Sequence, residues 1–196
     1  MRVYAQGIRI VVTMAALPNP MTVAQFRELP EGGEFTYELH YGEVVRVTRP
    51  KARHSELQHR LFELLKPKLT AFGVVRIECA YRGVPEYDLR AADVGVISHD
   101  RWKSMDLDDN LHGAPDLVIE VKSPSNTRKK LGEVVSLCLA TGSRQCWILE
   151  PDRKSVAVYR LGCPVAIYGP GATVPLTAFG SDALPVDEIF SESSHR

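Results

Sequence analysis

Hydrophobic residues recur along the chain with two periods, and each period predicts one kind of secondary structure. Runs rich in Val and Ile are typical of strands, whereas leucines spaced three or four residues apart are typical of helices. The first pattern predicts a β-hairpin over residues 34–48 that turns at Tyr41 and Gly42. It also predicts later strands over residues 74–81, 92–98, 117–122, 145–150, 155–161 and 165–168.

Helical signals fall between these strands. Thr22 is a capping residue for a short helix over residues 23–28. The last helix is expected to begin at Asn126 or Thr127 and to stop at Gly142. Its predicted apolar stripe consists of Leu131, Val134, Val135 and Cys138.

A longer helix is predicted between the hairpin and the strand over residues 74–81. Ser55 and Gln58 have the spacing of a capping box, and leucines recur after them at helical intervals. Pro67 should kink or end this helix. The order of hairpin, helix, three strands, helix and three strands predicts an α/β (α+β) fold, with a mixed central β-sheet flanked by helices and an N-terminal β-hairpin.

Composition adds limits to this picture. The chain has 196 residues, 44% of them hydrophobic, and its 24 Lys and Arg balance its 24 Asp and Glu. This length is sufficient for one core, so we expect a single domain over residues 21–190, an N-terminal extension over residues 1–20 and a tail over residues 191–196. Zero net charge gives no long-range attraction for DNA, so DNA binding must rest on a local basic surface.

Two further features concern the cellular compartment. Arg9 interrupts the first apolar run, and no run approaches the ~20 residues that a membrane-spanning helix needs. We therefore expect a cytoplasmic protein without membrane association. The cysteines form no C-x-x-C pair, so we expect buried free thiols rather than disulfides or a zinc site. They are Cys79, Cys138, Cys146 and Cys163.

The strand over residues 116–122 is the most informative, because charged residues interrupt an apolar segment. Alternation places Glu120 and Lys122 on the same face. A strand followed directly by a helix is typically central in its sheet, so this face should be partly covered. Ionised groups there cost roughly several kcal/mol unless they are paired or hold a metal. The alternative is a simple Glu120–Lys122 ion pair on an exposed face.

The preceding predicted strand carries a matching acid. Asp93 is its only acidic residue, and the small residues Ala91 and Gly95 leave room beside it for an ion or a backbone group. If the two strands are adjacent, Asp93 and Glu120 converge, and Lys122 lies roughly 7 Å further along. Two carboxylates and a lysine are the parts of a Mg²⁺-dependent phosphodiesterase.

Two similar patterns do not fit this chemistry. Asp116 follows a proline, as in a PD motif, but the four residues to Glu120 span roughly 13 Å, too far for one ion to bind both carboxylates. The segment Pro151-Asp152-Arg153-Lys154 repeats the motif in miniature, and we expect it to be a solvated turn.

A basic segment precedes the acidic strands. Residues 46–68 hold seven Lys or Arg against two Glu. Arg49, Lys51 and Arg53 are the residues predicted to bind phosphate. His54 lies beside them and is a candidate catalytic residue, with a surface or capping role as the alternative. Glu38 or Glu43 of the hairpin are candidates for a third carboxylate.

These motifs resemble those of a known family. The segment over residues 90–94 with Asp93, the segment over residues 114–127 with Glu120 and Lys122, and Gly142 followed by residues 147–151 are similar to the Uma2 family of restriction endonucleases, in the PD-(D/E)XK nuclease superfamily. The resemblance spans residues 21–190. It implies a restriction-endonuclease-like fold, endonucleolytic hydrolysis of DNA, Mg²⁺ or Mn²⁺ as cofactor, and metal-binding roles for Asp93 and Glu120.

One position departs from the family pattern. Members often carry a lysine on the helix that follows the strand glutamate, next to an acidic residue, but here Val134 follows Glu133. The simplest interpretation is that Lys122 supplies that role. The alternative is a site that has lost its helix lysine, in which Lys122 is incidental.

Three functions therefore remain open on the sequence. The first is a metal-dependent endonuclease with DNA as its partner; its catalytic residues are Asp93, Glu120, Lys122 and His54. The sequence leaves open whether such an enzyme forms a homodimer. The second is a catalytically decayed nuclease fold that acts as a DNA-binding or interaction module. The third is an enzyme that uses the same residues on another phosphodiester or phosphoester.

Overall fold

The computed structural model describes residues 3–5, 8–10, 19–30, 35–48, 50–123 and 126–191, and its centre is a seven-stranded sheet. The strand order is β11-β10-β9-β8-β6-β5-β7. Neighbours are antiparallel except for the parallel pairs β8 with β9 and β5 with β7. The strands are β5 (Gly73–Arg82), β6 (Arg90–Ser98), β7 (Leu111–His112), β8 (Leu117–Val121), β9 (Gln145–Glu150), β10 (Ser155–Tyr159) and β11 (Ala166–Tyr168).

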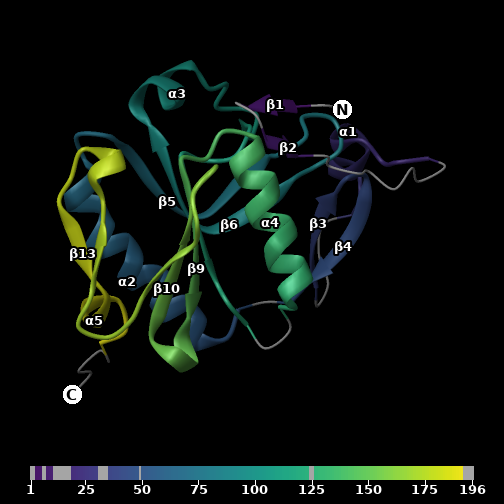
Figure 1. Ribbon diagram of the computed structural model, residues 1–196. Coiled ribbons are helices and arrows are strands. Elements are labelled where there is room, and N and C mark those ends of the chain that lie inside the picture. Colours follow the sequence, from purple (N-terminus) through teal and green to yellow (C-terminus); the bar gives the residue numbers. More distant parts are fainter. Residues whose placement is uncertain are drawn as a thin grey trace.

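Two helices cover the two faces of this sheet (Figure 1). α2 (Ala52–Leu69) packs its buried leucines on one face, and α4 (Arg128–Ala140) covers the other. Alternate side chains of β8 enter different layers, since Ile119 packs with the leucines of α2 and Val118 packs with Cys138 of α4. The predicted mixed sheet flanked by helices is confirmed, and β8 is the central strand that its apolar sequence indicated.

The long helix α2 differs from its prediction at its start. It begins at Ala52 after Lys51, which makes no side-chain cap, so the Ser55–Gln58 capping box is wrong. The Gln58 side chain bonds to two carboxylates instead of the helix start. The helix ends at Leu69, two residues after Pro67, in agreement with an end predicted near this proline. A proline in the last turn removes only one backbone hydrogen bond, and the fully buried Leu69 keeps that turn packed.

The N-terminal hairpin and the helix caps follow their predictions. β3 (Thr36–His40) and β4 (Glu43–Val47) pair across Tyr41 and Gly42, whose φ angles of 52° and 85° match the left-handed turn that suits a tight hairpin. Thr22 caps α1 (Val23–Arg27), and its side chain accepts a hydrogen bond from the Gln25 backbone.

Thr127 caps α4 in the same way, and its side chain accepts from the Lys130 backbone. The predicted turn after β9 is a short 3₁₀ helix over Pro151–Arg153, so the miniature motif lies in a turn as expected.

Several short elements have no counterpart in the sequence-based prediction, because few residues in each carry the pattern. The N-terminal strands β1 and β2 pair only with each other, and β12 pairs with β13. The additional elements are β1 (Val3–Ala5), β2 (Ile8–Ile10), α3 (His99–Ser104), β12 (Thr173–Pro175), a 3₁₀ helix over Thr177–Phe179, β13 (Ala183–Pro185) and α5 (Val186–Ile189).

The state and the burial of the cysteines were also predicted from the sequence. All four cysteines are free thiols, and Cys79, Cys138 and Cys146 are buried as expected. Cys163 is exposed, so the prediction of burial is wrong there; it lies in the turn between β10 and β11.

Among the described residues, no helix has the length and apolar character needed to cross a membrane.

Candidate active site

Asp93 of β6 and Glu120 of β8 lie on neighbouring antiparallel strands, as the sequence predicted. The pairing of Val94 with Ile119, extended by one position, sets Asp93 opposite Glu120. The ladder ends there because Asp93 Oδ2 accepts a hydrogen bond of 2.6 Å from the Val121 backbone N–H. Of the two groups predicted beside Asp93, an ion or a backbone group, the structure therefore shows a backbone group, the Val121 N–H of the next strand.

The other oxygen of Asp93 is held by α2. Asp93 Oδ1 lies 2.8 Å from His54 Nε2 and accepts a second bond of 2.8 Å from Gln58 Nε2. A carboxylate offers about four lone-pair positions, and these three contacts use most of them. Asp93 is thus fixed in orientation, and these donors leave about one of its lone-pair positions unused.

Gln58 joins two acidic strands. Its side-chain amide, only 2% exposed as a residue, donates to both Asp93 and Glu78 Oε1. Glu78 lies in β5 opposite Asp93, between the pairs Ile77 with Val94 and Cys79 with Ala92, and has a φ angle of 48°. This left-handed backbone is costly for a residue with a side chain and is typical of functional sites.

Gln58 and Glu78 were not among the predicted site residues. The signal available in the sequence was the spacing of Gln58, which follows His54 by four residues and therefore lies on the same face of the helix. Glu78 carried no comparable signal, because its backbone conformation depends on the tertiary fold.

Glu120 is in the opposite situation from Asp93. Within the described part of the chain, no hydrogen-bond donor or ion-pair partner contacts its carboxylate. Every fully buried side-chain oxygen of the described residues has a partner, so the unpaired oxygens of Glu120 are accessible to solvent. Burial raises the pKa of Glu120 well above its ordinary value, and the negative charge of Asp93 raises it further. A carboxylate in this position would be stabilised by a cation.

Of the two hairpin acids that the sequence offered, Glu38 lies near the site, where Asp93, Glu120 and Glu78 are the other carboxylates, and Glu43 is exposed. Glu38 Oε1 accepts a bond of 3.0 Å from the Ala91 backbone, and Oε2 lies 2.6 Å from His40 Nε2. Its charge helps to raise the pKa of Glu120. The hairpin is therefore anchored beside the start of β6 and contributes negative charge to the site.

His54 reaches the site from the first turn of α2. Its hydrogen bond to Asp93 raises the pKa of the imidazole above its ordinary value of 6.5, although burial acts in the other direction. The structure thus joins His54 to the predicted acidic pair.

Lys122 follows β8 and points its ammonium group to a neighbouring strand. Its Nζ lies 3.4 Å from Glu150 Oε2, at the end of β9. In the described residues it has no contact with Asp93 or Glu120. The helix position without lysine, Val134, packs against the core beneath α4, as do the other residues of the predicted stripe.

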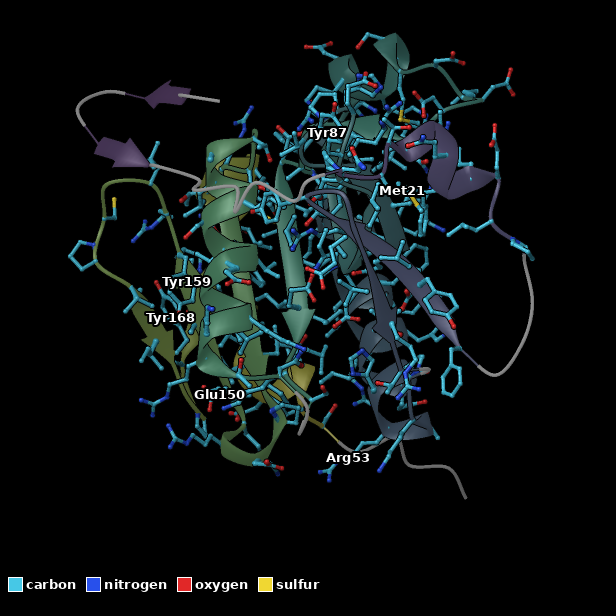
Figure 2. All side chains as sticks on the ribbon, turned by 90° about the vertical axis from the view of Figure 1, so that its right-hand side faces the viewer. Met21, Arg53, Tyr87, Glu150, Tyr159 and Tyr168 are labelled. Carbon is cyan, nitrogen blue, oxygen red and sulfur yellow. The ribbon has the colours of Figure 1, made fainter. Side chains whose placement is uncertain are left out.

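The basic residues are only partly described. Lys51 and Arg53, at the start of α2, are exposed, whereas Arg49 lies outside the described residues. Figure 2 shows Arg53 and Glu150 toward the same end of the molecule. The exposed cations, the Lys122–Glu150 pair and the N-terminal turn of α2 therefore share that end.

The carboxylate of Asp116 is paired within the fold, and its position just before β8 keeps it apart from Glu120, as the spacing predicted. It is 4% exposed and accepts a bond of 2.9 Å from the Ser98 backbone N–H. Arg101 and Arg144 approach its side-chain oxygens at 3.2 and 3.5 Å. These contacts lie at the end of β8 away from Glu120.

The fold and the family of this chain can be compared with those of known proteins. Residues 23–187 match the Uma2 family, whose description is "Putative restriction endonuclease". The chain belongs to this family. No curated protein matches the chain.

A solved structure supports the fold. A protein from Anabaena variabilis ATCC 29413, described as "a putative nuclease belonging to DUF820", superimposes with a TM-score of 0.74 at 23% identity. The match covers 88% of this chain and 98% of that one. Family and fold together support a nuclease-like function.

Proposed function

We propose that this protein is a metal-dependent endonuclease that hydrolyses phosphodiester bonds in DNA, with Mg²⁺ or Mn²⁺ as its cofactor. The observation that carries this proposal is the pair of opposed carboxylates in which Asp93 is fixed by three donors and Glu120 has none among the residues that the structure describes. Membership of the Uma2 family supports the same activity.

The residues present fit a magnesium ion. No group of three or more His, Cys, Asp or Glu among the described residues is arranged as a metal cage. Mg²⁺ usually keeps several waters and binds through one or two carboxylates and the substrate phosphate. Asp93, through its remaining lone-pair position, and Glu120 would hold the ion.

The chain's own residues would support this chemistry in distinct ways. A bound Mg²⁺ supplies Lewis-acid polarisation of the scissile phosphate and lowers the pKa of water. Gln58 and the Val121 backbone keep the Asp93 carboxylate from rotating. His54 holds Asp93 through Nε2 and would present Nδ1 to the substrate.

Lys122 would supply the lysine of the site in place of the residue at position 134. This role requires its ammonium to leave Glu150 and turn toward the phosphate. We expect Lys122→Ala to lower cleavage by about a hundredfold, as for removal of one group that stabilises developing charge, and Glu150→Gln to preserve cleavage. If Val134→Lys raised cleavage while Lys122→Ala had no effect, the helix position would be the functional one.

The direct test is cleavage of a supercoiled plasmid and of linear duplex DNA with Mg²⁺, Mn²⁺ or EDTA, for the wild type and Asp93→Ala. We expect metal-dependent cleavage that Asp93→Ala abolishes, and calorimetry should show metal binding by the wild type only. Metal-independent DNA binding without cleavage would instead support a decayed nuclease fold that acts as an interaction module. Cleavage of small phosphodiesters only would support the third alternative.

DNA contacts would come from Arg49, Lys51 and Arg53. A surface that engages three or four phosphates loses affinity on the order of a hundredfold between 50 and 200 mM salt. We expect the alanine variant of Arg49 and Lys51 to flatten this dependence in fluorescence anisotropy, and Asp93→Ala to leave it unchanged. As a control, the alanine variant of Lys103 and Arg160 removes the same charge from other exposed positions; an equal effect of both variants would argue against a localised phosphate surface.

A further inference from the structure

One face of the β3–β4 hairpin gathers exposed aromatic side chains beside a guanidinium group. Tyr37 pairs directly with Arg46 across the two strands, and Phe35 precedes Tyr37 by two positions, so the three side chains share a face. Tyr37 is 46% exposed and Phe35 is 39% exposed. The Arg46 guanidinium lies 4.1 Å from the centre of the Phe35 ring.

This hairpin face is connected to the candidate active site on both sides. Glu38, the residue after Tyr37, points to the opposite face and bonds to the Ala91 backbone, two residues from Asp93. β4 leads through four residues into the start of α2, where Lys51 and Arg53 are exposed. The aromatic face therefore belongs to a hairpin that directly precedes the basic start of α2 along the chain and is bonded to β6 beside Asp93.

The chemistry of this face separates it from the other exposed apolar positions. Ile167 of the sheet edge β11 is 70% exposed, but it is aliphatic and offers no aromatic ring on which a base could stack. Aromatic rings and planar guanidinium groups are the surfaces on which unpaired nucleic-acid bases stack, and nearby cations neutralise the phosphates that join them. Duplex DNA offers no free base faces except at its ends.

We propose that Tyr37, Phe35 and Arg46 form a stacking platform for unpaired bases of DNA, so that the site favours single-stranded or locally unpaired substrates. This rests on the function proposed above, because DNA is the ligand that the carboxylate site and the basic residues would share. The hairpin holds the platform in place through Leu39, which is fully buried and bonds to the Leu89 backbone.

The test compares binding of one labelled 12-nucleotide DNA as a single strand and as a blunt duplex, by fluorescence anisotropy in EDTA so that no cleavage occurs. Tyr37→Ala should weaken single-strand binding by about tenfold, as for loss of one base–aromatic stack, and change duplex binding by less than about twofold. Tyr37→Phe should keep the wild-type preference because it keeps the ring. Ile167→Ala is the control for loss of an exposed hydrophobic side chain elsewhere.

The outcomes separate this platform from the nuclease activity. Selective loss of single-strand binding in Tyr37→Ala, with a wild-type unfolding temperature, supports the platform even if the wild type cleaves no DNA. Equal loss for both DNA forms, no loss for either, or a wild type that binds neither form at 50 mM salt would overturn it. Equal loss for both DNA forms, or no loss for either, would leave the proposed metal-dependent cleavage by the wild type unaffected. Should Tyr37→Ala fail to fold, Phe35→Ala together with Tyr37→Phe provides the same comparison.

Discussion

The two ends of strand β8 carry carboxylates in opposite circumstances. Asp116, just before the strand, is saturated by the Ser98 backbone and by two arginines. Glu120, four residues later, has no donor among the described residues and has its pKa raised by burial and by Asp93. Both residues follow apolar neighbours in the sequence, so the difference arises from what the fold brings to each.

This contrast separates structural acids from candidate ligands. A buried carboxylate whose oxygens are all hydrogen-bonded stabilises the fold and has little capacity for another ligand. A partly buried carboxylate without donors lowers the stability of the fold, and a bound cation would relieve that cost. Asp93 combines both properties, because its three donors orient it and still leave one position open.

The largest effect is expected from Glu120→Gln. This change removes a charge that would hold the metal, so cleavage should fall by at least about a thousandfold. The free energy of unfolding should equal or exceed that of the wild type, because the amide needs no counter-charge. Cleavage assays test the loss of activity, and urea unfolding at neutral pH tests the stability. A large loss of stability with full cleavage would mean that Glu120 stabilises the fold and does not hold the metal.

Asp116→Ala should show the reverse pattern. Its loss removes the acceptor of the Ser98 N–H and one of the acceptors of the Arg101 guanidinium, which keeps the Ala114 and His112 carbonyls. This should lower the free energy of unfolding by about 1–3 kcal/mol. Metal binding at the other end of the strand should persist in the folded fraction. Calorimetric titration with Mn²⁺ at low temperature measures this binding. A folded Asp116→Ala variant that does not bind Mn²⁺ would mean that metal binding near Glu120 depends on Asp116.

Gln58→Leu tests the donors that fix Asp93. We expect metal affinity to fall about 10- to 100-fold, as for other residues that orient a ligand. Gln145→Leu is a matched control, because Gln145 is also buried and accepts a bond of 2.8 Å from Trp147 Nε1, away from the carboxylates. The control should lose stability without changing Mn²⁺ binding. Equal affinities for both variants would mean that Gln58 only fills the core.

The smallest effect concerns Asp109, a saturated carboxylate near the surface. Although desolvation acts to raise it, hydrogen bonds from Arg27, His112 and Arg82 lower the pKa of Asp109 below its ordinary value of 3.8. A lowered folded-state pKa stabilises the protein above about pH 4, and this contribution disappears as the pH falls further and the carboxylate becomes protonated.

Asp109→Asn should therefore reduce the free energy of unfolding by about 1 kcal/mol at pH 7. The difference from the wild type should remain constant down to about pH 5 and shrink below pH 4. Urea unfolding of both proteins between pH 3 and pH 7 measures it. A difference that grows toward low pH would show that Asp109 is not held as an ionised group.

Sequence patterns were sufficient for the elements that place the site. The apolar alternation around Asp93 and Glu120 predicted two strands, and the structure pairs them. Thr22 and Thr127 cap their helices because side-chain capping depends on residues only three positions apart. The Ser55–Gln58 capping box failed because a tertiary contact claimed the Gln58 side chain.

What the sequence by itself determined is therefore the order and type of the main elements, including the two strands that carry Asp93 and Glu120, because strand alternation and helix periodicity are local. The tertiary structure made these two strands neighbours. Only the tertiary structure decided which donors reach those acids. Gln58, Glu78 and Glu150 contact their partners across 20 to 35 residues of chain or between neighbouring strands. Such contacts depend on the packing of α2 against the sheet and on strand order, which no short-range pattern specifies.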